Sequence, residues 1–292
     1  MILSSYLANV FSIILNSWMF IVIGIIANLI LEAVIPKKII LSNLEKKDFF
    51  TIIRASVSGL LISGLSFGVV PLIVSLRKNG ASISACAAML AFTPWTGAFG
   101  LIVIGGYVGM TNLLVLLGCS FLLSIMLGFI FSLLEGLSLL KHKPRINENY
   151  LKEINYSKFS KYLSRKSGIK EISASVSDIL KNVFIAVLLT AFFQVIFTAD
   201  FIAFNFSSNY ASLYSIPLAT LIEIIGEGFT LFAGEIYLSG ASLGAVFSII
   251  MAGVITDINE LRMLAKIFSK RAATAYLIIG LALTVAFSFL LI

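Results

Sequence analysis

Glu223 and Glu227 are the residues whose type and spacing best support chemistry. They are four residues apart, so on a helix both carboxyl groups lie on one face. Both lie within the apolar stretch 213–238, where an ionised carboxylate costs about 2.5–3.5 kcal/mol at the centre of a bilayer. Such a pair could exchange a proton or bind a cation. The alternative is a structural role, in which the carboxylates accept hydrogen bonds from backbone amides freed beside Gly226 and Gly228.

A second set of candidate residues lies near breaks in the apolar stretches. Its members are small, or carry a hydroxyl group or a proline ring: Ser66, Gly68, Pro71, Ser82, Thr93, Pro94, Gly228, Thr230, Ser242 and Gly253. Irregular backbone at membrane depth occurs where protein covers it or where it lines a cavity. We therefore expect these residues to line a substrate or ion site together with the two glutamates. The alternative is that the hydroxyl groups bond to their own helix backbones.

A short passage occurs twice in the sequence, 160 residues apart. The repeated positions are Gly80-Ala81-Ser82 and Gly240-Ala241-Ser242, Gly68 and Gly228, and Thr96 and Thr256. A duplicated apolar unit with glycine-containing breaks at matching places is typical of secondary transporters. The pattern predicts two inverted structural repeats whose breaks meet at the binding site.

The composition restricts the class of protein. Apolar residues make up 59% of the chain and charged residues 12%, against about 25% charged in soluble domains. The net charge of +7 does not indicate nucleic-acid binding, because the basic residues cluster beside apolar stretches, as in cytoplasmic loops. One histidine, two cysteines and no phosphate-binding loop signature leave no zinc site, no Ser-His catalysis and no ATP site. We expect no cofactor, no metal and no enzymatic activity.

Eight apolar stretches predict an all-α polytopic membrane protein. They cover residues 9–35, 49–76, 81–110, 112–139, 177–198, 213–238, 241–256 and 273–292. The first repeat is expected at 1–140 and the second at 177–292. A basic linker, 141–176, joins them.

Two topologies fit these stretches. If all eight cross the membrane, two basic loops face outward and break the positive-inside rule. If 81–110 and 241–256 are re-entrant or broken hairpins, each repeat has three full spans, and the linker and both basic loops are cytoplasmic. Only Arg77 and Lys78 are then outside. The charge distribution favours the second topology.

Several other polar residues have simpler expected roles. Asp257 is the expected N-cap of a helix over 258–270. Gln194 is expected to form hydrogen bonds between helices. Glu235 lies near the end of a stretch and could reach water, so it is a weaker candidate than Glu223.

Several motifs resemble a known family of permeases. They are Gly68-Val69-Val70-Pro71-Leu72, Thr93-Pro94-x-Thr96-Gly97, Glu223-x-x-x-Glu227-Gly228-x-Thr230 and Met251-Ala252-Gly253. The chain resembles the predicted permeases typified by the organoarsenical efflux permease ArsP. The resemblance implies a multi-span exporter of a small solute. It departs from the arsenical pattern at Leu65, Ser66 and Phe67, where Cys-x-Cys is expected, so soft thiol ligands are missing there.

The leading hypothesis is a secondary active exporter in the plasma membrane, of organoarsenical type by resemblance. The Glu223 and Glu227 carboxyl groups would couple transport to a proton or another cation. The alternative is a passive channel or facilitator. The expected partners are a small solute or ion and the lipid bilayer, with a homo-oligomer left open.

Overall fold

The computed structural model is helical throughout the part of the chain that it describes. It describes residues 2–34, 49–62, 69–78, 80–93, 95, 97–137, 139–140, 148–153, 169–207 and 210–291. Four helical segments there are long and apolar enough to cross a membrane: Ile2–Ile30, Met110–Gly136, Val176–Ile196 and Lys270–Phe289. A fifth span results if two bent helices, Leu243–Thr256 and Ile258–Ile267, are counted together. The expectation of an all-α membrane protein is confirmed.

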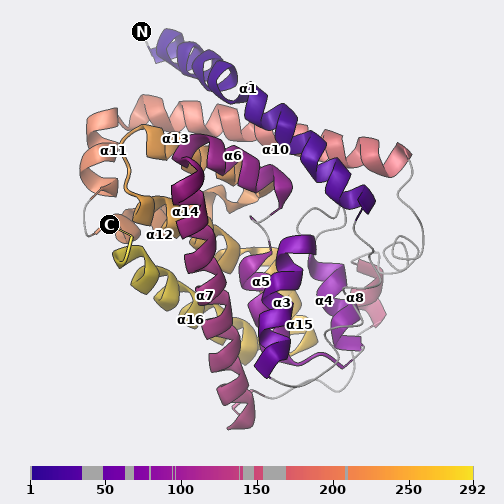
Figure 1. Cartoon of the computed structure of the whole chain (residues 1–292). Coiled ribbons are helices and arrows are strands. Elements are labelled where there is room, and N and C mark those ends of the chain that lie inside the picture. The colour runs from indigo at the N-terminus through magenta and orange to yellow at the C-terminus, as the bar shows by residue number, and fades with distance from the viewer. Residues whose placement is uncertain are drawn as a thin grey trace.

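Helices of very different lengths alternate along the chain (Figure 1). The first part contains α1 (Ile2–Val34), α3 (Phe49–Ile62), α4 (Val69–Lys78), α5 (Ile83–Phe92), α6 (Ala98–Val108) and α7 (Met110–Gly136). The last part contains α10 (Ile169–Ile196), α11 (Ala199–Phe206), α12 (Ala211–Ile222), the 3-10 helix η1 (Glu223–Gly228), α13 (Phe229–Leu238), α14 (Leu243–Thr256), α15 (Ile258–Ile267) and α16 (Lys270–Phe289). The short helix α8 (Glu148–Glu153) and the first turns of α10 fall within the linker range expected from the sequence.

The turns before α5 and α14 have the same local structure. Gly80 and Gly240 have φ values of 92° and 99°, a region that side chains with a Cβ rarely adopt. In each turn the following serine, Ser82 or Ser242, caps the next helix by accepting a hydrogen bond from a backbone N–H three residues later, at 3.2 Å. The repeated Gly-Ala-Ser passage is therefore a helix-capping turn in both places.

The segment 81–110 does not fold back on itself. Both α5 and α6 pack against the long helix α7. Three contacts follow one another along α7, namely Gly105 with Leu113, Phe92 with Phe121, and Ala88 with Gly128. As the chain advances through α5 and α6, it therefore moves steadily toward the start of α7. The expected hairpin is wrong here, because packing along one straight helix holds α5 and α6 in a single broken span.

The segment 241–267 has the same arrangement against α16. The bend between α14 and α15 is 41°, far from a reversal of direction. Contacts again follow in order, namely Gly244 with Leu291, Phe247 with Phe287, and Ile255 with Gly280. The expected re-entrant hairpin at 241–256 is also wrong. Residues 258–267 instead continue the span as α15, whose apolar side packs on α4 and α16.

The segment 49–78 is the one that turns back in the first part of the chain. Ile52, near the start of α3, lies against Gly128 in the last third of α7. Arg77, near the end of α4, lies over the ring of Phe268, 5.1 Å from its centroid. Phe268 is just before α16, whose first turns lie beside the last turns of α7 through an edge-on contact of Phe131 with Tyr276. Both ends of 49–78 therefore lie at the same end of α7.

The segment 211–238 also turns back, and both of its ends lie at the opposite end of the molecule. The aromatic rings of Phe206, in α11, and Tyr214, in α12, are 6.0 Å apart. The backbone N–H of Ser242, four residues after α13, donates to the Phe206 carbonyl at 2.9 Å. The start of α12 and the end of α13 therefore both lie beside α11. Figure 1 shows α3 and α4 near the lower end of α7 and α11 and α13 near its upper end.

Candidate functional site

The turn of the segment 211–238 is formed by η1 and depends on a glycine. Gly226 has φ 55° and ψ −133°, a backbone conformation outside the regions open to other residues. A Cβ on Gly226 would also lie 2.8 Å from Nδ2 of Asn182 in α10. The break predicted at Gly226 and Gly228 is therefore a sharp change of direction between α12 and α13.

This turn contacts the breaks of both broken spans. At its start, Glu223 Oε1 accepts a hydrogen bond of 3.0 Å from the backbone N–H of Ile258, at the bend between α14 and α15. Just after its end, Thr230 lies beside Gly100, at the start of α6, where a Cβ would be 3.3 Å from the threonine methyl group. We call the region around Trp95, Gly100, Glu223, Thr230, Asp257 and Glu260 the central site. Three interruptions distant in sequence meet there.

The carboxyl groups of Glu223 and Asp257 bind the first turn of α15. Asp257 Oδ1 accepts hydrogen bonds from the backbone N–H groups of Asn259, at 2.7 Å, and Glu260, at 3.1 Å. Asp257 is thus the N-cap of α15, as expected from the sequence. The Glu223 carboxylate satisfies a further N–H of the same turn, and the positive end of the helix dipole favours negative charge on both groups. In the structural role considered for Glu223, its carboxylate accepts a hydrogen bond from a backbone amide. Such a bond is present, although the amide is that of Ile258 rather than one of η1.

Buried polar atoms without a hydrogen-bond partner also lie at the central site or beside it. They are Trp95 Nε1, Glu260 Oε2 and the Tyr276 hydroxyl oxygen, on residues at most 4% exposed. Native interiors leave few such atoms, because each costs about 1–3 kcal/mol. A donor and a carboxyl oxygen without partners are groups that a polar solute or a proton would engage.

The remaining expected site residues lie in several places. Thr93, Gly228 and Thr230 are buried next to the breaks, and Thr93 Oγ1 donates to the Met89 carbonyl. Pro71 is buried in the first turn of α4, where a proline ring is tolerated. Gly253 is buried in α14, and a Cβ there would meet nothing within 4 Å.

Other expected site residues are not at the central site or fall outside the described part. Ser82 and Ser242 cap α5 and α14 at the ends of these helices that are farthest from the breaks. Ser66, Gly68, Pro94 and the side chain of Glu227 lie outside the described residues.

Glu260 and Trp95 were not among the candidates expected from the sequence. Glu260 lies three residues after its N-cap, the spacing of a capping box. Its sequence position therefore suggests a capping role and gives no sign that the side chain is buried. Trp95 is the variable position of the motif Thr93-Pro94-x-Thr96-Gly97, so the motif itself does not identify it.

Glu235 is part of a separate polar cluster. Its Oε1 accepts a hydrogen bond of 2.7 Å from the Tyr107 hydroxyl, and its Oε2 accepts one of 3.2 Å from Gln194 Nε2. These bonds join α6, α10 and α13, which confirms the interhelical role expected for Gln194. Because Glu235 is 5% exposed, the suggestion that it reaches water is wrong.

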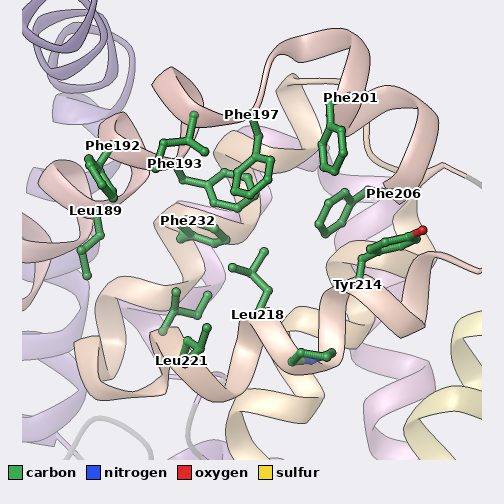
Figure 2. A pocket seen from close by; sticks show the side chains of 13 residues that line it. Leu189, Phe192, Phe193, Phe197, Phe201, Phe206, Tyr214, Leu218, Leu221 and Phe232 are labelled. Carbon is green, nitrogen blue, oxygen red and sulfur yellow. The ribbon is translucent and has the colours of Figure 1, made fainter. Parts of the chain in front are cut away.

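An apolar cavity of about 410 Å³ adjoins the turn of 211–238 (Figure 2). Four helices and Phe197 surround it, and its lining is Leu189, Phe192, Phe193, Ile196, Phe197, Phe201, Phe206, Tyr214, Pro217, Leu218, Leu221, Ile222 and Phe232. Ile222 directly precedes Glu223, so the apolar cavity and the acidic part of the central site are adjacent in the chain. Leu221 and Phe192 are more than half exposed, which opens the cavity toward the outer surface of the bundle.

Comparison with known proteins gives one match. A family model described as a predicted permease matches residues 3–291, nearly the whole chain. Searches of curated proteins and of solved structures give no significant match.

Proposed function

Because this chain belongs to the ArsP_1 family of predicted permeases, it is a membrane transport protein, and we propose that it is a secondary active exporter of a small solute. The observation that carries this proposal is the meeting of three chain breaks around one buried carboxyl group, Glu260, and two partly exposed ones, Glu223 and Asp257. Broken helices around a midplane site are the usual construction of alternating-access transporters.

The proposed architecture is a pair of inverted repeats. In support, α4, α5, α6 and α7 begin 160 residues before α13, α14, α15 and α16, respectively. Each repeat would contribute two unbroken spans, one broken span and one re-entrant segment. The re-entrant segments are 49–78 and 211–238. Both ends of 49–78 lie at one end of the bundle, and both ends of 211–238 lie at the other. In such a pair of repeats α4 is equivalent to α13 and α15 to α6, so the α4–α15 contact has its equivalent in the α13–α6 contact.

The proposed orientation follows from the basic residues. We propose that 49–78 is re-entrant, so that the basic residues of the sequence ranges 37–47, 141–168 and 262–271 fall on one side of the membrane together with Arg77 and Lys78. No lysine or arginine occurs in 79–140 or 182–261, which include the loops of the other side. The positive-inside rule then places the linker in the cytoplasm of a cell whose plasma membrane contains the protein.

We further propose that the Glu223 and Glu227 carboxyl groups couple a proton or another cation to solute movement. Movement of the 211–238 segment relative to α15 would break the bond between Glu223 and the Ile258 amide and expose the carboxylate. The proposed lining of the pathway includes Ser66, Gly68, Thr93, Pro94, Gly228, Thr230 and Gly253. Pro71 would shape it, and Ser82 and Ser242 would fix its two broken spans.

The chemistry of the site favours an organic solute. The aromatic cavity beside Ile222 would accept an apolar group, and the central site would accept a polar one. An organoarsenical fits this description through the family resemblance. The thiolate ligands that such a compound prefers are absent at Leu65 and Phe67, so we propose that binding does not depend on thiol coordination.

The test is transport by purified protein in liposomes. A panel of trivalent and pentavalent phenylarsenicals, arsenite and small aromatic anions would be screened first by growth of expressing cells and then by uptake. Accumulation against a concentration gradient, only when a pH or cation gradient is imposed, is the expected result. Equilibration without accumulation would instead establish a channel or facilitator. Glu223→Gln combined with Glu227→Gln should abolish gradient-driven accumulation, and unchanged accumulation would refute the coupling role.

A further inference from the structure

Three carboxyl groups surround the N-terminus of α15, but backbone donors serve only two of them in the described structure. Glu223 and Asp257 accept three N–H bonds of the first turn between them, at 2.7–3.1 Å. Hydrogen bonds to the charged form stabilise a carboxylate, and so does the helix dipole. Backbone N–H donors therefore serve both of these carboxyl groups.

The third carboxyl group, that of Glu260, has no such support. Its side chain is 4% exposed, and its Oε2 has no hydrogen-bond partner. In a capping box it would accept a bond from the backbone N–H of Asp257. That N–H instead faces the Val254 carbonyl, at 3.5 Å. An ionised Glu260 would thus leave a buried carboxylate oxygen without a donor, which is costly in a protein interior.

Tyr276 on α16 is the polar neighbour of this carboxyl group. The tyrosine is fully buried, its hydroxyl oxygen has no partner, and Glu260 and Asp257 are the charged groups that act on it. Two side chains more than nine-tenths buried therefore present unpaired oxygen atoms in the same region. The two unpaired oxygen atoms are not hydrogen-bonded to each other in this conformation, so a rotation of either side chain is needed before the hydroxyl can donate to the carboxyl group.

The groups that face Glu260 from the packed elements include no free cation. Glu223 and Asp257 act on it as like charges. On α4, Arg77 and Lys78 lie at the far end, where Arg77 contacts Phe268 just beyond the end of α15. The sequence of α14 contains no titratable residue. The remaining basic residues of α15 and α16, namely Arg262, Lys266, Lys270 and Arg271, are on exposed positions.

We propose that Glu260 carries the transported proton of this permease, with the Tyr276 hydroxyl as its hydrogen-bond partner. Taking up the proton forms an O–H bond on the Glu260 carboxylate, and releasing it to water on the other side of the membrane restores the anion. Glu223 and Asp257 accept the N–H bonds of the helix N-terminus in the conformation described here. The inference rests on the proposed function, since it assigns the coupled ion and adds its carrier to the Glu223–Glu227 pair.

The test is infrared difference spectroscopy of the full-length protein in liposomes at neutral pH. The C=O stretch of protonated carboxyl groups should be present in the wild type and weaker in Glu260→Gln. The matched control is Glu235→Gln, which alters an equally buried carboxylate that already has two donors, and it should leave the band unchanged. No band in the wild type, or a band of unchanged area in Glu260→Gln, would overturn the proposal.

A second variant keeps the test informative if Glu260→Gln does not fold. Tyr276→Phe should shift the frequency of the band without removing it, because the hydrogen bond to the carboxyl group is lost. An unshifted band would exclude Tyr276 as the partner. The spectra need neither solute nor gradient, so a failure of the transport assay would sink the proposed function without altering this result.

Discussion

Glu223 and Ile258 are joined by a hydrogen bond of 3.0 Å from the Ile258 backbone N–H to the glutamate Oε1. The bond connects the turn of the 211–238 segment to the bend of the α14–α15 span. It explains why a carboxylate within an apolar stretch can coexist with ordered helices, since the carboxylate serves the helix N-terminus that the bend creates. Any movement of the turn relative to the span must break this bond.

The proposed topology can be tested by cysteine labelling in a background with Cys86→Ala and Cys119→Ala. Asn205→Cys should react with a membrane-impermeant thiol reagent added outside intact cells, because the proposed topology has α11 on the outer side. Lys78→Cys should be protected until the cells are opened, because in the same topology 49–78 returns to the cytoplasmic side. Outside labelling at position 78 would restore the hairpin at 81–110.

The turn at Gly226 should be intolerant of any side chain. We expect Gly226→Ala to destabilise the protein by about 1–3 kcal/mol, because a non-glycine residue is strained at φ 55°, ψ −133°. The contact of the new Cβ with Asn182 would add to this cost. The measurement is the thermal unfolding midpoint of purified protein in detergent.

A glycine in an ordinary helix provides the control for this substitution. Gly118 is on α7, and a Cβ there would meet nothing within 4 Å. Gly118→Ala should be neutral or stabilising by up to about 1 kcal/mol. Equal losses of stability for Gly226→Ala and Gly118→Ala would show that η1 does not have the strained conformation described.

The Tyr107–Glu235 hydrogen bond should contribute measurably to stability. Tyr107→Phe removes the 2.7 Å bond and leaves a buried carboxylate with only Gln194, so we expect a loss of about 1–2 kcal/mol. In a Glu235→Gln background the side chain at 235 is neutral, so Tyr107→Phe should lower the stability by a smaller amount there. Additive effects in this double-mutant cycle would argue against coupling between the two side chains.

Transport should not depend on either cysteine. Cys86 is fully buried in α5 among apolar neighbours, and Cys119 is partly buried in α7. We expect Cys86→Ala with Cys119→Ala to retain at least half of the wild-type uptake of whichever solute the panel identifies. A loss confined to trivalent arsenicals would instead show that one thiol serves as a soft ligand.

The sequence by itself determined the class of the protein and several local features. Its apolar content required a membrane protein, and the 160-residue spacing of Gly80 and Gly240 marked two equivalent places in the chain. Asp257 was recognisable as an N-cap because capping depends on residues close in sequence. Such features follow from local backbone chemistry, which residue type and order are enough to specify.

Only the tertiary structure decided which apolar stretches turn back. A break in an apolar stretch does not show in sequence whether the chain bends, as by 41° at Asp257, or reverses, as at Gly226. The choice depends on packing, because α7 and α16 each hold a broken helix pair along their length and leave 49–78 and 211–238 to turn back. The burial of Glu260 could not be predicted from the sequence for the same reason, since it results from contacts with helices distant in sequence.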